Sequence, residues 1–272
     1  MKKQFSLFLL SGIFFQLSKA ATVDTVSIYS NAMNKSFKCV IITPDSYEKK
    51  ESSYPVVFLL HGHSSNYARW VEKAPNIKTY SDQFQMIIVC PDGDYNSWYL
   101  DSPVDTSLKF ETYVSKEVPA YIDSNYKTIK DRKARAITGL SMGGHGGLFL
   151  GFRHADFFGA CGSMSGGVDL RPFPKSWQLS EKLGDNKTDS LNWKNYSVNT
   201  VIENKPTYPL AVIFDCGTED FFYQVNNALH EKMLRLKIPH DYIERPGQHD
   251  WNYWANAIEY QLLFFKKFFD RK

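Results

Sequence analysis

One serine in this sequence is surrounded by glycines. The stretch AITGLSMGGHGG places Ser141 in the pattern Gly-x-Ser-x-Gly, between Gly139 and Gly143. An apolar run precedes the serine and a helical pattern follows it, which predicts a sharp strand-to-helix turn with an exposed hydroxyl. The glycines allow backbone to approach closely at that turn, and the helix N-terminus favours negative charge. The pattern therefore indicates a nucleophilic serine.

A serine hydroxyl needs a general base before it can attack a substrate. In proteins with this kind of turn, the chain order is serine, then Asp or Glu, then histidine. The sequence contains seven histidines, and His249 follows the last strand-like run in the stretch RPGQHDWNYW. We therefore predict that His249 is the base. The alternative is a histidine of a surface loop beside two tryptophans.

The acid that orients the base is expected after the preceding strand. The stretch IFDCGTEDFF offers Asp215, Glu219 and Asp220. Asp215 still belongs to the predicted strand, whereas the other two lie in the loop that follows. We predict Asp220 as the acid, with Glu219 as the alternative and with helix capping as a second role of Asp220. Asp250 adjoins His249 and cannot easily fold back onto its neighbour's ring.

Two backbone N–H groups are needed to stabilise the oxyanion that a serine attack creates. One is expected from Met142, which follows the nucleophile. The other is expected from the loop after the apolar run VVFLLHGH. We prefer the amide of His63, and Gly62 remains the alternative. Both residues would otherwise only end a strand.

Strand-like and helical patterns alternate along the chain, which predicts an α/β fold with a mostly parallel sheet covered on both faces. Two alternating runs, TVDTVSIYS and SFKCVIITP, predict antiparallel opening strands. A polar stretch at 168–207 predicts a loop with short helices over one end of the sheet. The further strands are expected within 54–62, 84–93, 133–141, 157–166, 208–217 and 240–247, and the helices within 107–125, 144–154, 221–236 and 252–269.

The N-terminus is typical of an export signal. Two lysines precede the apolar stretch FSLFLLSGIFFQL, and small residues flank Lys19 in SKA. We predict a signal peptide at 1–20, cleaved after Ala20 or Ala21, and a single domain at 21–272. The protein is then secreted or periplasmic. The alternative is a membrane-anchoring helix at 1–20.

The net charge of the chain bears on which partners it can bind. The net charge of +3 includes three lysines in residues 1–20 and no acidic residue there, so the mature chain has 3 − 3 = 0. The mature chain therefore lacks the basic excess that would indicate binding to nucleic acid or to an anionic membrane surface.

The four cysteines lie in or beside apolar runs without metal-site spacing, so buried free thiols are favoured over disulfides. They are Cys39, Cys90, Cys161 and Cys216.

Several motifs together resemble those of an esterase family that contains tributyrin esterases, S-formylglutathione hydrolases, feruloyl and acetylxylan esterases and mycolyltransferases. The matching stretches are LLHGHSSNYARW, PDGDYNSWYLDSP, GLSMGGHGGLFLGFRHADFFGACGSMSGG, CGTEDFF and GQHDWNYW. The resemblance implies an α/β-hydrolase fold with a triad of Ser141, Asp220 and His249. It implies no metal and no organic cofactor.

The resemblance also draws attention to the loop NSWYLDS at 96–102. In relatives this loop borders the active site, so Trp98, Tyr99 and Asp101 are expected to contact the substrate. The alternative is a loop anchored by its aromatic residues. The cysteine-containing oxyanion loop of relatives with a glutathione substrate is absent here, which argues against S-formylglutathione.

We therefore expect an exported serine carboxylesterase for acetyl- or feruloyl-type esters, including those attached to polysaccharides. An acyltransferase with the same triad is the alternative enzyme. A carbohydrate-binding protein on an inactive hydrolase scaffold is the alternative of another class, and a peptidase would normally bring a larger lid. The sequence leaves the oligomeric state open.

Overall fold

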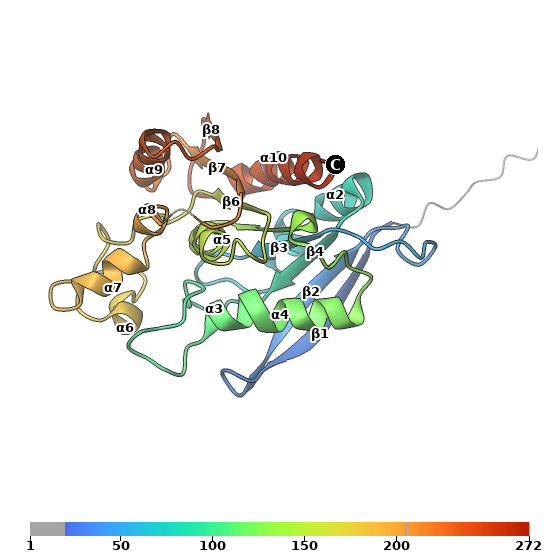
Figure 1. Ribbon diagram of the computed structural model, residues 1–272, viewed down its shortest axis with the longest axis horizontal. Coiled ribbons are helices and arrows are strands. Elements are labelled where there is room, and N and C mark those ends of the chain that lie inside the picture. The colour runs from blue at the N-terminus through green and yellow to red at the C-terminus, as the bar shows by residue number, and fades with distance from the viewer. Residues whose placement is uncertain (1–19, 205, 272) are drawn as a thin grey trace, which may run out of the picture.

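A single twisted sheet forms the centre of the computed structural model, which describes residues 20–204 and 206–271 (Figure 1). In these residues the sheet has eight strands in the order β1-β2-β4-β3-β5-β6-β7-β8. β2 pairs antiparallel with β1 and β4, and every later neighbour is parallel. The strands are β1 (Thr22–Ser30), β2 (Lys35–Thr43), β3 (Val56–Leu60), β4 (Ile87–Pro91), β5 (Arg135–Gly139), β6 (Ala160–Met164), β7 (Ala211–Gly217) and β8 (Asp241–Arg245).

Helices cover both faces of the sheet, as predicted. In Figure 1, α10 and α2 lie on one side of the sheet and α4 lies on the other. The helices are α1 (Arg69–Lys73), α2 (Ile77–Phe84), α3 (Phe110–Thr112), α4 (Val118–Asn125), α5 (Met142–Arg153), α6 (Ser180–Leu183), α7 (Ser190–Asn195), α8 (Val198–Val201), α9 (Tyr223–Arg235) and α10 (Trp251–Phe269). A π-helical turn, η1 (Tyr113–Glu117), joins α3 to α4, and a 3₁₀ turn, η2 (Arg132–Ala134), precedes β5.

The apolar strands are buried because each contributes to two cores. Successive side chains of a strand point to opposite faces. In β3, Phe58 packs in one core with α4, α5 and α9, whereas Val57 packs in the other with α2 and α10. A strand that is apolar at every position is therefore stable only between two layers of helices. Because β3 to β8 are all parallel, their carboxyl ends lie at one edge of the sheet.

The helix boundaries show two differences from the sequence predictions. The helix expected over 107–125 begins at Phe110 and is interrupted by η1. The sequence patterns also did not predict α1 and α2 between β3 and β4. They have only five and eight residues, too few for a clear periodic pattern, and packing against the sheet stabilises them.

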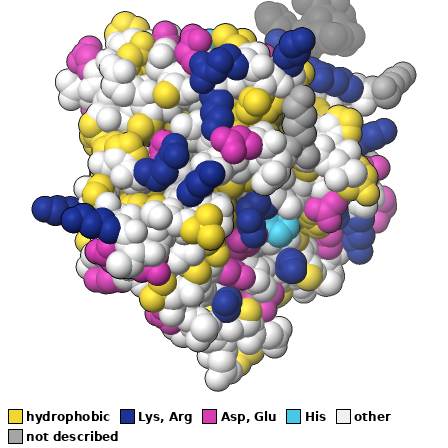
Figure 2. Space-filling model, turned by 60° about the vertical axis from the view of Figure 1, so that its left-hand side comes forward, with side chains coloured by type: hydrophobic (Ala, Val, Ile, Leu, Met, Phe, Trp, Pro, Cys, Tyr) yellow, Lys and Arg dark blue, Asp and Glu magenta, His cyan; other side chains and the backbone are white. Residues whose placement is uncertain are grey.

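The segment 168–207 carries three short helices, as the sequence predicted. α6 and α7 lie at one end of the molecule (Figure 1). Figure 2 turns this end toward the viewer and shows Lys and Arg side chains interspersed with Asp and Glu. This face therefore has no continuous basic surface.

All four cysteines are buried and free, which agrees with the expectation of thiols rather than disulfides. Within residues 20–204 and 206–271, no helix combines the length and the apolar character that crossing a membrane requires. The predicted signal peptide lies outside the described residues except for Ala20.

Candidate active site

The predicted strand-to-helix turn is present at Ser141, between β5 and α5. Ser141 has φ 55° and ψ −115°, a conformation that costs free energy for a residue with a side chain. A Cβ added at Gly139 would lie 2.6 Å from the carbonyl oxygen of Gly143, and one at Gly143 would lie 2.5 Å from that of His61. Both positions therefore require glycine, because only glycine allows these backbone segments to pack so closely.

Three side chains from three loops form a continuous chain of polar contacts. Ser141 Oγ lies 2.9 Å from His249 Nε2, and His249 Nδ1 lies 2.8 Å from Asp220 Oδ2. Asp220 follows β7, and His249 lies between β8 and α10. The carboxylate accepts the Nδ1 hydrogen, so the Nε2 lone pair faces the serine hydroxyl. This arrangement can transfer a proton from the serine as it attacks a carbonyl carbon.

The carboxylate is itself held in place. Asp220 is 5% exposed, and its Oδ1 accepts a hydrogen bond from the backbone N–H of Phe222 at 2.8 Å. Phe221 and Trp254 pack against the His249 ring, with centroids at 4.2 and 4.8 Å. These contacts restrict the rotation of the imidazole and the carboxylate, which keeps the reacting atoms aligned.

Three backbone amides beside the serine are candidates to bind an oxyanion. Met142 is the first residue of α5, so its N–H has no partner within the helix. Across the part of the chain that the structure describes, the N–H of His63 donates to no protein acceptor. The amide of Gly62 likewise has no protein acceptor there, and a Cβ at Gly62 would lie 3.5 Å from Ser141 Cβ. The loop after β3 therefore adjoins the nucleophile, as predicted, and both residues remain candidates.

A small cavity of about 200 Å³ opens beside Ser141. Four of its ten lining residues are Trp or Phe. His63 packs against Tyr95 at 4.9 Å, and burial together with the charge of Lys182 lowers the pKa of His63. The cavity is lined by Gly62, His63, Ser65, Leu140, Ser141, Trp177, Phe221, His249, Trp251 and Trp254.

Comparison with known proteins identifies the family. The sequence profile of the family described as "Putative esterase" matches residues 30–265. The chain belongs to this esterase family. An acetyl esterase of Caldicellulosiruptor saccharolyticus is 27% identical over 261 residues, which cover 86% of this chain and 96% of that protein. A diacylglycerol acyltransferase/mycolyltransferase of Mycobacterium gordonae is 30% identical over 273 residues, covering 87% of this chain and 78% of that protein.

A solved structure supports the same assignment. A ferulic acid esterase superposes with a TM-score of 0.79 at 30% sequence identity, over 92% of this chain and 99% of its own. The predicted α/β-hydrolase fold and the predicted class of carboxylic ester hydrolase are confirmed by these likenesses.

The other acidic residues considered for the esterase make different contacts. Glu219 Oε2 accepts a hydrogen bond from Gln248 Nε2 at 3.2 Å, and Asp250 caps α10 through the N–H of Tyr253. Asp215 lies in β7, fully buried, and accepts a hydrogen bond from Gln261 Nε2 at 2.8 Å. In the described structure none of these three carboxylates hydrogen-bonds to His249.

The buried Asp215 makes the stability of the esterase depend on pH. Burial raises the pKa of Asp215 from 3.8 to about 6, against the opposing effects of Gln261 and Arg245. The folded state binds more protons than the unfolded state between these two values, so stability falls as pH rises through them. Asp215 alone is expected to lower the free energy of unfolding by up to about 3 kcal/mol between pH 4 and 7.

Urea denaturation of wild type and Asp215→Asn across that pH range measures this effect. The asparagine variant keeps the contact with Gln261 and should lack the decrease attributed to Asp215. Equal pH dependence in the two proteins would show that Asp215 is ionised throughout and paired with Arg245, whose Nη2 lies 3.7 Å away.

The loop 96–102 does not contribute the expected residues to the cavity of the esterase. Trp98 and Tyr99 are buried, and the Tyr99 hydroxyl donates to the carbonyl oxygen of His61 at 3.0 Å. Asp101 accepts hydrogen bonds from the backbone and the side chain of Thr112. The burial of Trp98 and Tyr99 and the contacts of Tyr99 and Asp101 favour the alternative role that the sequence left open, a loop anchored by its aromatic residues. Direct substrate contact by these three residues stays a prediction.

Sequence reasoning missed most of the cavity wall. Trp177 comes from the polar segment 168–207, so this segment forms part of the cavity wall. Nothing in the local sequence distinguishes Trp177 from a core tryptophan. Trp251 and Trp254 lie close to His249 in the sequence, but only the histidine of that stretch was predicted to belong to the site. Across the described ranges, no cluster of three or more His, Cys, Asp or Glu side chains is placed to hold a metal ion.

Proposed function

We propose that this chain is an exported serine carboxylesterase that hydrolyses short-chain acyl or aryl esters of the acetyl and feruloyl type. The observation that carries the proposal is the hydrogen-bonded series Ser141–His249–Asp220, with contacts of 2.9 and 2.8 Å, at the mouth of an aromatic cavity. This combination of nucleophile, base and orienting acid is the arrangement that acyl transfer requires.

The reaction proceeds in two stages. His249 takes the hydroxyl proton of Ser141 as the oxygen attacks the ester carbonyl. The N–H groups of Met142 and of His63 stabilise the oxyanion, and His249 then protonates the departing alcohol. Water next attacks the acyl-enzyme with His249 again as the base, which releases the acid and restores Ser141.

The cavity supports small or planar acyl groups. A volume of about 200 Å³ is well below that of typical drug-sized ligand pockets. Flat side chains such as Trp177 and Phe221 stack with each other at 6.0 Å and 24°, and they can contact an aryl group in the same way. The similar proteins include an acetyl esterase and a ferulic acid esterase. Polysaccharide-linked esters of these acids are the substrates we propose.

The proposal also includes export. A signal peptide at 1–20 would leave a single hydrolase domain at 21–272, in the extracellular space or the periplasm. The sequence features that support it are the basic start, the apolar core and the small residues before Ala21.

Acyl transfer is a second candidate function. The likeness to a diacylglycerol acyltransferase/mycolyltransferase at 30% identity favours it. Both reactions form the same acyl-enzyme on Ser141, and only the group that attacks this intermediate differs. The contacts of Ser141, His249 and Asp220 therefore do not decide between water and a sugar hydroxyl.

A panel of esters tests the proposed function. The mature protein is expected to hydrolyse p-nitrophenyl acetate, methyl ferulate and acetylated xylan with higher kcat/KM than p-nitrophenyl octanoate, because the cavity volume is only about 200 Å³. A sugar acceptor added to the acetate reaction reports transfer as an acetylated sugar, detected by mass spectrometry. Preference for octanoate would contradict the proposed short-chain and aryl substrates, and no hydrolysis of any ester would contradict the esterase proposal. Acetylated sugar as the main product would favour the transferase.

A further inference from the structure

We propose that His61 is a positioning residue that fixes the orientation of one oxyanion-binding peptide. Its ring would hold the peptide between Gly62 and His63 so that the His63 N–H faces the reacting carbonyl. This inference rests on the proposed function, because it assigns the second oxyanion donor to His63 rather than to Gly62.

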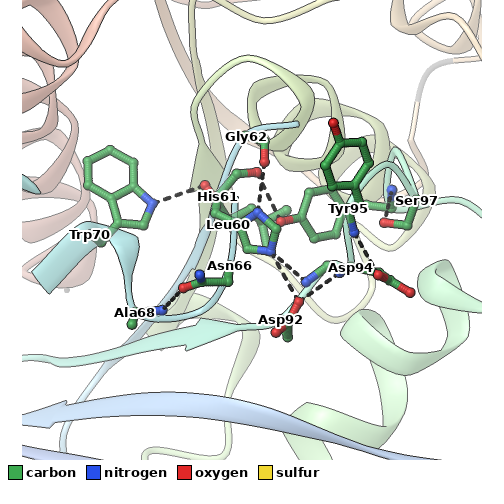
Figure 3. A network of polar contacts seen from close by, with 12 residues as sticks. Leu60, His61, Gly62, Asn66, Ala68, Trp70, Asp92, Asp94, Tyr95 and Ser97 are labelled. Carbon is green, nitrogen blue, oxygen red and sulfur yellow. Dashed lines mark hydrogen bonds and ion pairs between the residues drawn. The ribbon is translucent and has the colours of Figure 1, made fainter. Parts of the chain in front are cut away.

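Backbone groups contact both ring nitrogens of His61. The side chain is 1% exposed. Its Nδ1 lies 2.8 Å from the carbonyl oxygen of Gly62, and its Nε2 lies 2.7 Å from the backbone nitrogen of Gly93. Figure 3 shows the His61 ring between Gly62 and Asp92. His61 therefore links the loop after β3 to the loop after β4.

These two contacts determine the tautomer. A backbone N–H can only donate, so Nε2 of His61 must accept the hydrogen bond from Gly93 and carries no hydrogen. The neutral ring then has its hydrogen on Nδ1, and Nδ1 donates to the carbonyl oxygen of Gly62. Asp92 Oδ1 lies 3.5 Å from Nε2 of His61. Because Nε2 carries no hydrogen in this tautomer, it cannot donate a hydrogen bond to Asp92.

The contact with the Gly62 carbonyl also sets the direction of the next N–H. In a trans peptide the C=O and the following N–H point in opposite directions, and no cis peptide is found in the described chain. With the Gly62 oxygen held toward the His61 ring, the His63 N–H points away from that ring. Gly62 and His63 both line the cavity beside Ser141. The proposal places this N–H on the cavity side, where the substrate carbonyl would bind.

The residues on either side are fixed by other contacts. The carbonyl oxygen of Leu60 accepts a hydrogen bond from Trp70 Nε1 at 3.1 Å, and that of His61 accepts one from the Tyr99 hydroxyl at 3.0 Å. Beyond the peptide, the Ser64 N–H donates to the Tyr95 carbonyl at 2.8 Å. The peptide between Gly62 and His63 is held between these points by the His61 ring. A rotation of this single peptide would remove the donor without unfolding the loop.

Two amide substitutions separate the two ring contacts. In His61→Asn, the side-chain amide nitrogen takes the place of Nδ1 and can still donate to Gly62. In His61→Gln, the side-chain amide oxygen takes the place of Nε2 and can still accept from Gly93. If the contact with Gly62 positions the oxyanion donor, His61→Gln should lower kcat by about 100-fold with KM within about threefold, and His61→Asn should keep kcat within about fivefold of wild type.

Thermal unfolding of both variants provides the control for a purely structural role. His61→Asn loses the Gly93 contact and is expected to lower Tm while retaining kcat. Asp92→Asn should leave kcat within about twofold, because the proposed tautomer does not donate to Asp92. Loss of kcat in His61→Asn as large as in His61→Gln, or a kcat of His61→Gln near that of wild type, would overturn the proposal.

A measurement on the wild-type protein does not depend on activity. Nitrogen-15 NMR of the histidine rings at neutral pH is expected to show a protonated Nδ1 and an unprotonated Nε2 for His61, assigned by loss of its signals in His61→Gln. An imidazolium or an Nε2–H tautomer would overturn the proposal even if the esterase is fully active. The expected tautomer in a protein that hydrolyses no ester would show that the proposed function has failed and that the His61 geometry stands.

Discussion

Replacement of Ser141 by alanine is expected to lower kcat for p-nitrophenyl acetate by about five to six orders of magnitude. The hydroxyl oxygen is the atom that forms the bond to the acyl group, and it lies 2.9 Å from His249 Nε2. Among the described residues, no other side chain hydrogen-bonds to this nitrogen. Only the residual acceleration that substrate binding and the oxyanion-binding amides supply is expected to remain. Initial rates at saturating substrate measure it.

The same variant controls for folding. Ser141 is 9% exposed and its side chain makes no helix-capping hydrogen bond, so Ser141→Ala should keep the Tm of wild type within a few degrees. A variant that retains more than about 1% of the wild-type kcat would show that Ser141 is not the nucleophile.

Asp220→Asn is expected to lower kcat by about 10⁴-fold. The reason is the tautomer of His249. The N–H of Phe222 requires an acceptor, so the amide oxygen of the new asparagine faces Phe222 and its NH₂ group faces His249 Nδ1. Nδ1 must then accept, the ring hydrogen moves to Nε2, and the base that faces Ser141 is blocked. The kcat and KM for a chromogenic acetate ester measure this effect.

Glu219→Gln is the matched control for that variant. Glu219 adjoins Asp220 in the same loop, yet its carboxylate contacts Gln248. Its kcat is expected to remain within about threefold of wild type. If Glu219→Gln lost activity and Asp220→Asn retained it, the assignment of the acid would be reversed.

The sequence allowed the three central residues to be placed because each lies just after a strand. Parallel strands bring their carboxyl ends to one edge of the sheet, so residues that follow different strands meet there. Ser141 follows β5, Asp220 follows β7 and His249 follows β8. The glycines beside Ser141 added a local signal, because Gly139 and Gly143 have no room for a Cβ.

The cavity wall could not be predicted in the same way. Trp177 reaches the site from a segment whose short helices are stabilised by tertiary contacts, and its position depends on how the whole segment packs. The burial of Trp98 and Tyr99 could not be predicted for a related reason. Aromatic side chains are equally suitable for binding a substrate and for anchoring a loop in the core. Only the packing against the rest of the fold shows that these two are buried.

The role of His61 also required the structure. A histidine before a glycine has no distinctive spacing, and its importance depends on Gly93, which lies more than thirty residues later in the chain. Contacts of this kind follow from the pairing of β3 with β4, which brings the two loops together.

The central claim is that catalysis proceeds through a covalent intermediate on Ser141. Tandem mass spectrometry of the protein after reaction with a fluorophosphonate probe tests this most directly. We expect a single phosphonylated peptide containing AITGLSMGGHGG, with the modification on Ser141 and none in Ser141→Ala. Modification of a different residue, or an unmodified Ser141 in protein that still hydrolyses esters, would contradict the account.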